Sequence, residues 1–408
     1  MNEALCPSLP ESVAPQARAR LPLGGLLALA AAGFLTILTE ALPAGLLPSM
    51  GASLGVSQAL VGQLVTAYAL GSLVAAIPLV AATRGCRRRP LLLVAIGGFA
   101  LVNTITALST HYGLTLAARF LAGVFAGLLW ALLAGQASRM VTPALRGRAI
   151  AVAMLGAPVA LSLGIPAGTW LGGLLGWQVT FGAMSVLSVL LLGWVRWTVP
   201  DFPGASTARQ TGLRQVLALP GLSTVLWVLL AFVLAHNLLY TYIAPFLAQA
   251  GMAARIDVML LVFGGASLVG IWLTALLIDR WLRALVLAGI GAFGAAALVL
   301  GLANMANGQP AAIFAGMAVW GVAFGGAATL FQTAAANTAD GGSADAADVA
   351  QSLLVTAWNL AMALGGLAGG WLLADFGAQS LPWTPCLLLV LAGWGAWRGS
   401  AHGFPRRP

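Results

Sequence analysis

Two ionisable side chains, Glu40 and Arg119, interrupt apolar runs in the first half of this chain. Each run has about 20 apolar residues, the length at which a helix spans the hydrocarbon core of a bilayer. A charge at such a position costs several kcal/mol unless it is paired or hydrated, which makes it a functional candidate. Counted along the two runs, both residues lie about 10 Å from the same membrane surface. We therefore predict that the carboxylate and the guanidinium lie close enough to interact directly or through water.

Three roles for this pair are compatible with the residues. The pair could be a structural salt bridge that locks two helices together. Glu40 could instead take up and release a proton as the helices move, with Arg119 setting when it does so. In a third role, Glu40 contacts a substrate directly.

Other polar side chains inside the apolar runs are candidates for substrate binding, although such residues more often form interhelical hydrogen bonds. The candidates are Gln63, Tyr68, Asn103, His236, Asn237, Tyr240, Tyr242, Gln332 and Asn359. The strongest group is His236, Asn237 and Tyr240, because a spacing of three and four residues places them on one helix face. Pro245 follows closely and is expected to loosen that helix.

The elements that must position these side chains are membrane helices. Hydrophobic residues make up 60% of the chain and charged residues 7%, against about 25% charged residues in soluble domains. The sequence therefore predicts an all-α membrane protein with twelve transmembrane helices. The expected spans are 23–48, 58–82, 90–108, 113–137, 148–172, 178–198, 219–248, 257–278, 284–303, 310–334, 349–373 and 382–398.

The longest polar stretch between spans divides the twelve into six and six. We expect the following parts: an N-terminal cytoplasmic tail (1–22), a six-helix bundle (23–198), a cytoplasmic linker (199–218), a second six-helix bundle (219–398) and a cytoplasmic tail (399–408). Small residues crowd the fifth and eleventh spans, for example Gly156 and Gly366. Such residues let helices approach closely, either for static packing or to form a surface on which the bundles rock.

The distribution of arginine predicts the orientation. All 19 basic residues are arginine, and all except Arg119 and Arg255 fall in the tails or the connections on one side. Because basic residues remain in the cytoplasm, both termini are expected there. The composition, rich in Ala, Gly and Arg and free of Lys, is typical of a GC-rich bacterial genome. We therefore expect a multi-pass protein of a bacterial inner membrane, embedded in the lipid bilayer as a monomer.

Several classes of function are disfavoured. The positive charge lies between spans and is not interleaved with aromatic residues, so we expect no nucleic-acid partner. Asp340, Asp345 and Asp348 have no neighbouring histidine and are read as a solvated loop, so we expect no metal and no cofactor. A phosphate-binding loop with lysine is absent from a chain without lysine, which argues against an ATP-driven pump. An enzyme acting on lipid-linked substrates stays an alternative, although few acidic residues are available for it.

Five stretches of sequence together resemble a known family. Thr39-Glu40-Ala-Leu-Pro43-Ala-Gly45-Leu-Leu-Pro48 is similar to the first-span signature of the drug:proton antiporter branch of the major facilitator superfamily. Leu116-Ala-Ala-Arg119-Phe-Leu-Ala-Gly123 resembles that superfamily's fourth-span motif, and the stretch from Met154 to Gly168 resembles its fifth-span motif. Tyr240 to Phe246, with Trp358-Asn359, looks like the corresponding spans of its sugar-efflux and arabinose-efflux members.

The resemblance implies two pseudo-symmetric six-helix bundles around a central substrate site, the fold of that superfamily. It implies proton-coupled export of a small organic molecule, such as a sugar, nucleoside or drug-like compound, with Glu40 and Arg119 in proton coupling. An uncoupled facilitator or importer of the same solutes is the alternative.

It also implies gating loops at Arg84, Arg87 and Arg88 and at Asp279 and Arg280. The first loop departs from the family because Thr83 stands where an aspartate is usual. We expect Asp279 to supply the acidic partner that the first loop lacks.

Overall fold

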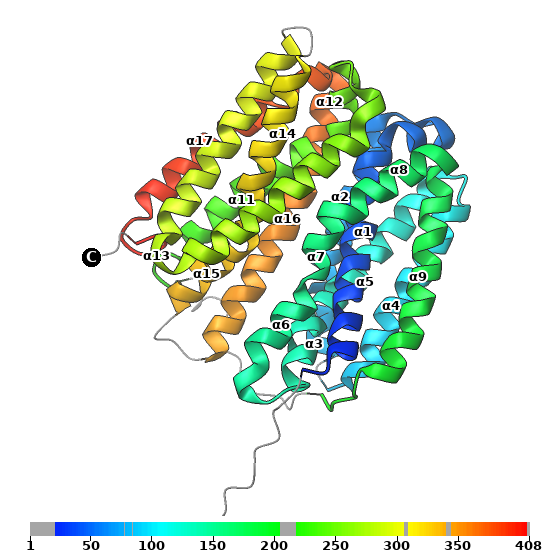
Figure 1. Cartoon of the computed structure of the whole chain (residues 1–408), viewed down its shortest axis with the longest axis vertical. Helices are drawn as coiled ribbons and strands as arrows, with labels where there is room; N and C mark the ends of the chain where they lie inside the picture. The colour runs from blue at the N-terminus through cyan, green and yellow to red at the C-terminus, as the bar shows by residue number, and fades with distance from the viewer. Residues whose placement is uncertain are drawn as a thin grey trace, which may run out of the picture.

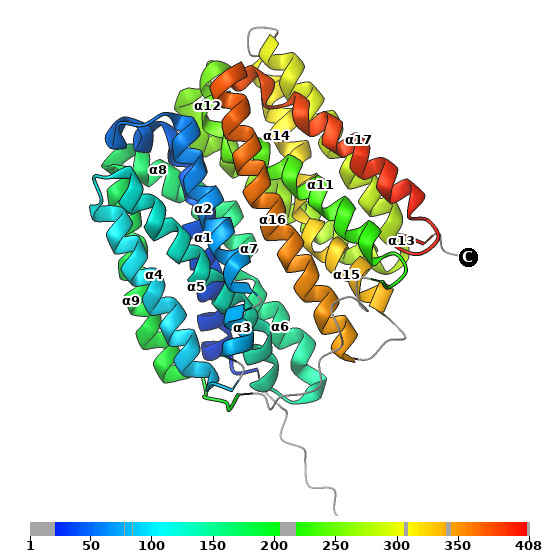
Figure 2. The same cartoon turned by 180° about the vertical axis from the view of Figure 1, so that it is seen from behind.

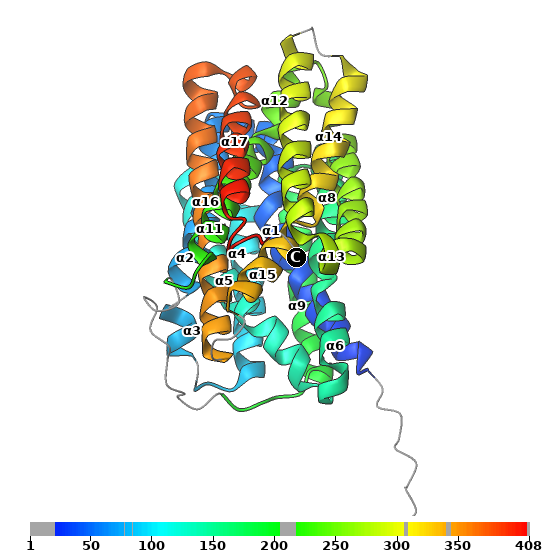
Figure 3. The ribbon, with the colours of Figure 1, turned by 90° about the vertical axis from the view of Figure 1, so that its left-hand side faces the viewer.

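The backbone of the chain is almost entirely helical in the computed structural model, which describes residues 21–76, 78–83, 85–204, 218–305, 309–339 and 344–405. Two groups of helices lie side by side (Figures 1 and 2), and the long helices of both groups run along one common direction (Figure 3). In hydrocarbon every backbone N–H and C=O must find its partner within the protein, and a helix achieves this within one segment. The apolar runs accordingly fold as helices from end to end.

The first group, called the N-bundle below, extends from Leu23 to Thr198. Its helices are α1 (Leu23–Leu54), α2 (Gln58–Ala76), α3 (Pro78–Ala82), α4 (Arg88–Leu108), α5 (Tyr112–Arg139), α6 (Arg146–Met154), α7 (Gly156–Val159), α8 (Ile165–Leu175) and α9 (Trp177–Thr198). A π-helical turn at Ala160–Gly164 joins α7 to α8. The end of the molecule where α1 begins is called the near end, and the opposite end, where α1 finishes, is called the far end.

The second group, called the C-bundle below, extends from Leu222 to Arg398. Its helices are α11 (Leu222–Thr241), α12 (Ile243–Gln249), α13 (Ile256–Met305), α14 (Pro310–Gly325), α15 (Ala327–Ala339), α16 (Ala344–Phe376) and α17 (Trp383–Arg398). The expected loosening by Pro245 is confirmed, because α11 finishes at Thr241 and α12 begins after Tyr242. A proline has no N–H to bond the carbonyl of Thr241.

The number of crossings agrees with twelve. Among the described residues, ten helical segments are long and apolar enough to cross a membrane. One of them, Ala253–Met305, has 53 residues, which would span about 80 Å as a straight helix. Its backbone leaves helical geometry at Trp281, so it supplies two crossings. The shorter α17, with 16 residues, adds the last. The linker residues 205–217 lie outside the described ranges.

Glycines bring helices into backbone contact inside each bundle. A methyl group at Gly123 of α5 would collide with the carbonyl oxygen of Tyr68 and the nitrogen of Ser72 on α2. Gly71 of α2 meets the backbone of α5 at Phe120 in the same way. In lipid, where no hydrophobic force drives helices together, such close packing holds them.

This packing gives a test on one helix. Gly123→Ala forces α2 and α5 apart, and overpacking of this kind costs about 1–3 kcal/mol. We expect a clearly lowered thermal unfolding midpoint in detergent. Gly135→Ala, also on α5 but with no atom within 4 Å of the added methyl, is the matched control and should leave the midpoint unchanged or slightly raised. Equal midpoints for the two variants would contradict this account of the packing.

Candidate functional site

Arg119 lies in the middle of the N-bundle, with none of its surface exposed. Its Nη1 donates a hydrogen bond to the carbonyl oxygen of Thr39 on α1, and its Nη2 donates to Oδ1 of Asn103 on α4 at 3.4 Å. Asn103 in turn donates through Nδ2 to the hydroxyl of Thr39 at 3.1 Å. Three helices are thereby joined at one level by a single charged side chain.

Aromatic rings complete the surroundings of this guanidinium. It lies 5.1 Å from the ring centre of Phe181 and 5.9 Å from that of Tyr68, and each such cation–π contact is worth about 0.5–2 kcal/mol. Tyr68 is held in place because its hydroxyl donates to the carbonyl of Thr36 at 3.2 Å. The Nε of Arg119 has no hydrogen-bond partner among the described residues. The guanidinium therefore has a buried Nε–H without a hydrogen-bond partner among the described residues.

Glu40 does not pair with Arg119 in this conformation. The ion pair of Arg87 with Asp201 is the only one within the described ranges. Glu40 is half-buried on α1, one residue after the carbonyl that Arg119 binds. Its carboxyl is close enough for its charge to act on the hydroxyls of Tyr68 in the N-bundle and Tyr240 in the C-bundle. The Arg119 guanidinium thus bonds the backbone carbonyl next to Glu40, so the two residues are close as predicted. The predicted direct interaction of their side chains is not present in this conformation.

An aromatic cluster in the C-bundle includes Tyr240, which lies within electrostatic range of Glu40. His236 stacks on Phe324 with ring centres 3.4 Å apart, and Tyr240, Phe263 and Trp320 surround it at 5.1–5.8 Å. Nδ1 of His236 and Nε1 of Trp320 are buried without a partner within the described part of the chain. The face predicted for His236 and Tyr240 is confirmed by their stacked rings, while the contribution of Phe263, Trp320 and Phe324 was missed. Aromatic residues inside an apolar run give no signal in the sequence that separates a site from ordinary packing.

Two amide side chains follow ring residues along the chain, Asn237 after His236 and Asn359 after Trp358. Each donates through Nδ2 to a carbonyl one turn earlier, at 3.0 Å, and no described donor bonds either side-chain oxygen. Trp358 of α16 is half-buried, with its ring centre 6.1 Å from that of Phe324. Gln332 is exposed on α15, and its backbone carbonyl accepts from Gln351 at 3.0 Å. The C-bundle candidates thus gather around rings and amides, whereas Tyr68 and Asn103 are buried around Arg119.

Two other substrate candidates, Gln63 and Tyr242, join the bundles at the far end. Tyr242 is fully buried, and its hydroxyl donates to the carbonyl of Gly366 on α16 at 2.8 Å. Gln63 of α2 donates through Nε2 to the Tyr242 hydroxyl at 3.0 Å and to Gly366 at 3.2 Å. This set, called the far-end latch below, links both bundles through one phenol.

Glycines allow this latch to form. A methyl group at Gly369 or Gly370 of α16 would collide with Tyr242, and one at Gly366 would collide with Thr66 of α2. By contrast, Gly156 of the fifth span packs against the backbone of α1 at Ala30, inside its own bundle. In the eleventh span, Gly366 and Gly370 therefore face α2 of the other bundle, whereas Gly369 packs on Tyr242 of its own bundle.

A different set of contacts holds the near end of the N-bundle. Arg87 forms an ion pair with Asp201 at 2.6 Å, and the backbone N–H of Arg89 donates to the other carboxylate oxygen at 3.1 Å. Gln136 and Arg139 of α5 donate to the carbonyls of Pro200 and Pro203 at 2.6 and 2.9 Å. The segment after α9 is therefore fastened to the α3–α4 connection and to α5; we call it the near-end clasp.

The acidic partner of the first gating loop is thus Asp201, in place of the expected Asp279. Asp279 forms no ion pair with any described residue; with Arg280 it lines a pocket at the near end of the C-bundle. Arg88 contributes its backbone N–H to the carbonyl of Phe202 at 2.9 Å, and Arg84 lies outside the described ranges. A lone acidic residue just after a span, on the side of an arginine run, was the available signal for Asp201.

Comparison with known proteins agrees with this architecture. The sequence model of the Major Facilitator Superfamily matches residues 29–349. This chain belongs to that superfamily. It is a secondary transporter of small organic solutes and not an enzyme, and its two bundles of membrane helices are the fold of that superfamily.

Named relatives and solved structures are similar over nearly the whole transporter. It is 29% identical over 365 residues to the purine ribonucleoside efflux pump NepI of Shigella dysenteriae and to that of Escherichia coli K12, covering 87% of this chain and 89% of each relative. Its fold is similar to a bacterial homologue of the human lysosomal transporter Spinster, with a TM-score of 0.70, 15% identity and coverage of 95% and 99%. It is also similar to the human organic anion transporter MFSD10, with a TM-score of 0.65, 18% identity and coverage of 92% and 97%.

The far-end latch of this transporter gives a conformational prediction. Tyr242→Phe removes a hydroxyl that bonds both bundles, and a buried hydrogen bond contributes about 1 kcal/mol. We expect the population separated at the far end to rise about fivefold. Electron–electron distances between spin labels at Ala52→Cys and Gln379→Cys, in a chain with its native cysteines replaced by serine, should then extend to longer values.

Tyr112→Phe is the matched control, because its hydroxyl bonds only the carbonyl of Leu60 within the N-bundle, at 2.8 Å. Its distance distribution should resemble that of the parent chain. Identical distributions for Tyr242→Phe and Tyr112→Phe would exclude a latch at Tyr242.

The near-end clasp gives a prediction on pH. Partial desolvation raises the pKa of the Asp201 carboxyl, but the hydrogen bonds and charges of Arg89 and Arg87 lower it more, so its pKa lies below the ordinary value. A carboxyl whose pKa is lowered by folding stabilises the fold at every pH above its ordinary pKa. That stabilisation is lost as the pH falls through the lowered pKa. The stability difference between the parent and Asp201→Asn should therefore be present at neutral pH and shrink as the solution is acidified.

Thermal unfolding in detergent from about pH 7 to about pH 2 measures this difference. Arg87→Gln should lose part of the same stability at neutral pH, because the carboxylate keeps its bond to the Arg89 N–H. The double variant should lose little more than Asp201→Asn alone, because the two changes share one interaction. A difference between parent and Asp201→Asn that stays constant across the range would refute the clasp's dependence on this carboxylate.

Proposed function

We propose that this transporter exports a purine ribonucleoside or a closely similar solute in exchange for protons. The observation that carries the proposal is Glu40: a half-buried carboxyl without an ionic partner among the described residues, placed between the cation of one bundle and the aromatic rings of the other. A membrane transporter retains such a costly group where it acts on an ion or a substrate.

The orientation supports the direction of transport. Among the described residues, arginines cluster at the near end, in the connections after α3 and α5, in the last turn of α9 and at the turn of α13, and basic connections remain in the cytoplasm. With the termini in the cytoplasm of a bacterial inner membrane, the far-end latch lies on the periplasmic side. The conformation described here is then closed toward the periplasm, and α6 and α15 diverge at the cytoplasmic end (Figures 1 and 2).

The choice of substrate rests on two lines of support. The relatives that match over 87% of the chain are named purine ribonucleoside efflux pumps. The C-bundle offers groups that suit a purine base: the half-buried ring of Trp358 for stacking, and the side-chain oxygens of Asn237 and Asn359, which no described donor bonds, for its polar edge. Stacking of a base on an aromatic side chain is worth about 1–3 kcal/mol.

Proton coupling follows from how Glu40 and Arg119 are placed. In this conformation Arg119 donates to the Thr39 carbonyl and to Asn103, and the Glu40 carboxyl lies within electrostatic range of Tyr240 of the other bundle. A small rotation of α1, which carries both Thr39 and Glu40, would exchange the carbonyl for the carboxylate at the guanidinium. Pairing with the cation favours the charged carboxylate, and separation favours the protonated one. The protein then works as a monomer that loads a proton on one side and releases it on the other.

Transport into inside-out vesicles tests both parts of the proposal. With an acidic lumen, the parent should accumulate a labelled purine ribonucleoside such as inosine, up to about tenfold per proton for a gradient of about one pH unit. Glu40→Gln should lose accumulation but retain exchange of labelled for unlabelled nucleoside at equal pH. Asp375→Asn, an exposed acidic position on α16, is the matched control and should behave as the parent.

Each contrary outcome has a distinct meaning. Accumulation by Glu40→Gln at the parental level would remove Glu40 from proton coupling. Equilibration of nucleoside in the parent, with no response to the gradient, would make it a facilitator. Absence of nucleoside transport, with gradient-driven movement of a sugar or drug in the same vesicles, would reassign the substrate.

A further inference from the structure

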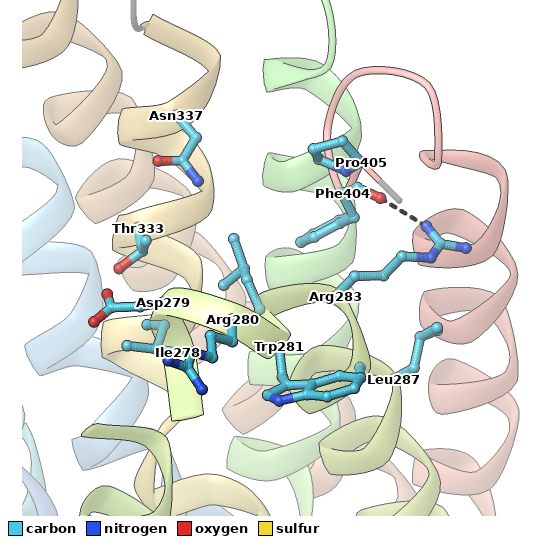
Figure 4. Close-up of a pocket in the computed structure, with 12 residues that line it drawn as sticks. Ile278, Asp279, Arg280, Trp281, Arg283, Leu287, Thr333, Asn337, Phe404 and Pro405 are labelled. Atoms are coloured by element: carbon cyan, nitrogen blue, oxygen red, sulfur yellow. Dashed lines mark hydrogen bonds between the residues drawn. The ribbon is translucent and has the colours of Figure 1, made fainter. Parts of the chain in front are cut away.

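A cavity of about 590 Å³ lies at the near end of the C-bundle. It is bounded by the turn of α13 around Trp281, by Thr333 and Asn337 of α15, and by the chain that follows α17 at Phe404 (Figure 4). None of the residues assigned to proton coupling or to the aromatic cluster lines it. The cavity therefore needs an account of its own.

One wall of this cavity is built by Arg283. Its Nη1 donates to the carbonyl of Phe404 at 2.8 Å and to that of Ala396 at 2.9 Å, and its Nη2 donates to that of Trp397 at 3.1 Å. Figure 4 shows the side chain directed toward the C-terminal turn, with the bond to Phe404 drawn. Phe404 is itself buried, and its N–H donates to Gly399 at 2.8 Å. The wall is thus fixed by bonds and is not formed by a loose tail.

The polar side chains along the rest of the lining are accessible, because Arg280 and Asn337 are exposed and Thr333 is half-buried. Arg280, Thr333 and Asn337 have side chains that form no hydrogen bond or ion pair with any described residue, although all three line the cavity. A guanidinium, a hydroxyl and an amide together supply several donors around one space. A planar guanidinium with neighbouring donors matches the geometry of phosphate oxygens.

The charge balance also favours an anion, with one opposing group. Two arginines, Arg280 and Arg283, line the cavity against one carboxylate, Asp279. Figure 4 shows Asp279 directed toward Thr333, on the side away from Arg283. The net charge of the whole lining is therefore positive, although beside the Thr333 hydroxyl the Asp279 carboxylate opposes the charge of Arg280.

Tryptophans place this cavity at the level of the membrane surface. Trp281 and Trp397 are each 59% exposed, and the Arg398 guanidinium lies 4.1 Å from the ring centre of Trp394. Exposed tryptophans beside arginines mark the level of the lipid headgroups. Basic pockets between helices at this level bind phosphate-bearing headgroups.

We propose that this cavity is a binding site for a phosphate monoester or diester, held by the Arg280 guanidinium with the Thr333 hydroxyl and the Asn337 amide. The phosphate belongs either to the headgroup of an anionic phospholipid or to a soluble phosphate ester. Bound there, it bridges the α13 turn to α15 and stabilises the near end of the C-bundle. The site is independent of the substrate and of proton coupling.

Binding to the purified full-length transporter in detergent tests the proposal. One arm adds phosphatidylglycerol, with phosphatidylcholine of the same acyl chains as the uncharged reference; the other adds glycerol 3-phosphate. Native mass spectrometry counts bound molecules, and the thermal unfolding midpoint reports stabilisation. We expect binding and a raised midpoint with phosphatidylglycerol or glycerol 3-phosphate, and none with phosphatidylcholine. Response to the lipid alone identifies a headgroup, and response to both identifies a site for soluble esters as well.

Variants assign the effect to the cavity. Arg280→Gln should weaken binding about tenfold, the loss expected when a charged hydrogen bond to phosphate is removed. Arg255→Gln, an exposed arginine at the far end, makes the same change of charge outside the cavity and should bind as the parent. Asp279→Asn should strengthen binding severalfold, because it removes the opposing charge. Equal binding by Arg280→Gln and Arg255→Gln, or weaker binding by Asp279→Asn, would overturn the proposal.

Discussion

Hydrocarbon offers no hydrogen-bond partners, and this constraint decides the form of the whole protein. Backbone groups are satisfied inside helices, so each apolar run folds as a helix. Polar side chains must be satisfied by their neighbours, so they meet in layers that cross several helices. The layer around Arg119 is the clearest case: a carbonyl of α1, an amide of α4 and two aromatic rings take the place of water.

The same constraint separates what is fixed from what can move. Within the bundles, glycines such as Gly123 hold helices in backbone contact over long stretches. Between the bundles, the described hydrogen bonds are few and gather around one phenol, that of Tyr242. A few polar bonds that join the bundles at one end can break while contacts form between the bundles at the other end. Alternating access requires such an exchange.

Glu40 lies close to this boundary, and its position suits the role in proton exchange proposed for it. A carboxyl buried wholly within one bundle would report only on that bundle. Glu40 instead shares α1 with the carbonyl that binds Arg119 and acts electrostatically on Tyr240 of the other bundle. In the proton exchange proposed above, relative motion of the bundles would change what surrounds this carboxyl and so its affinity for a proton.

The sequence by itself determined the helices, their approximate bounds and the membrane setting, because length and apolarity fix a transmembrane helix almost without reference to its neighbours. The sequence also predicted that Glu40 and Arg119 lie at a similar depth in the membrane and that His236 lies on the same helix face as Tyr240. Depth along a span and helical spacing are local properties, so both can be counted along the chain. Only the tertiary structure decided which partner each charge has. Arg119 binds the Thr39 carbonyl where Glu40 was expected, Asp201 supplies the acid expected from Asp279, and Gln63 and Tyr242 bond each other across the bundles. Partners depend on the rotation and distance of helices far apart in the chain, and a pattern of residues along one helix carries no record of either.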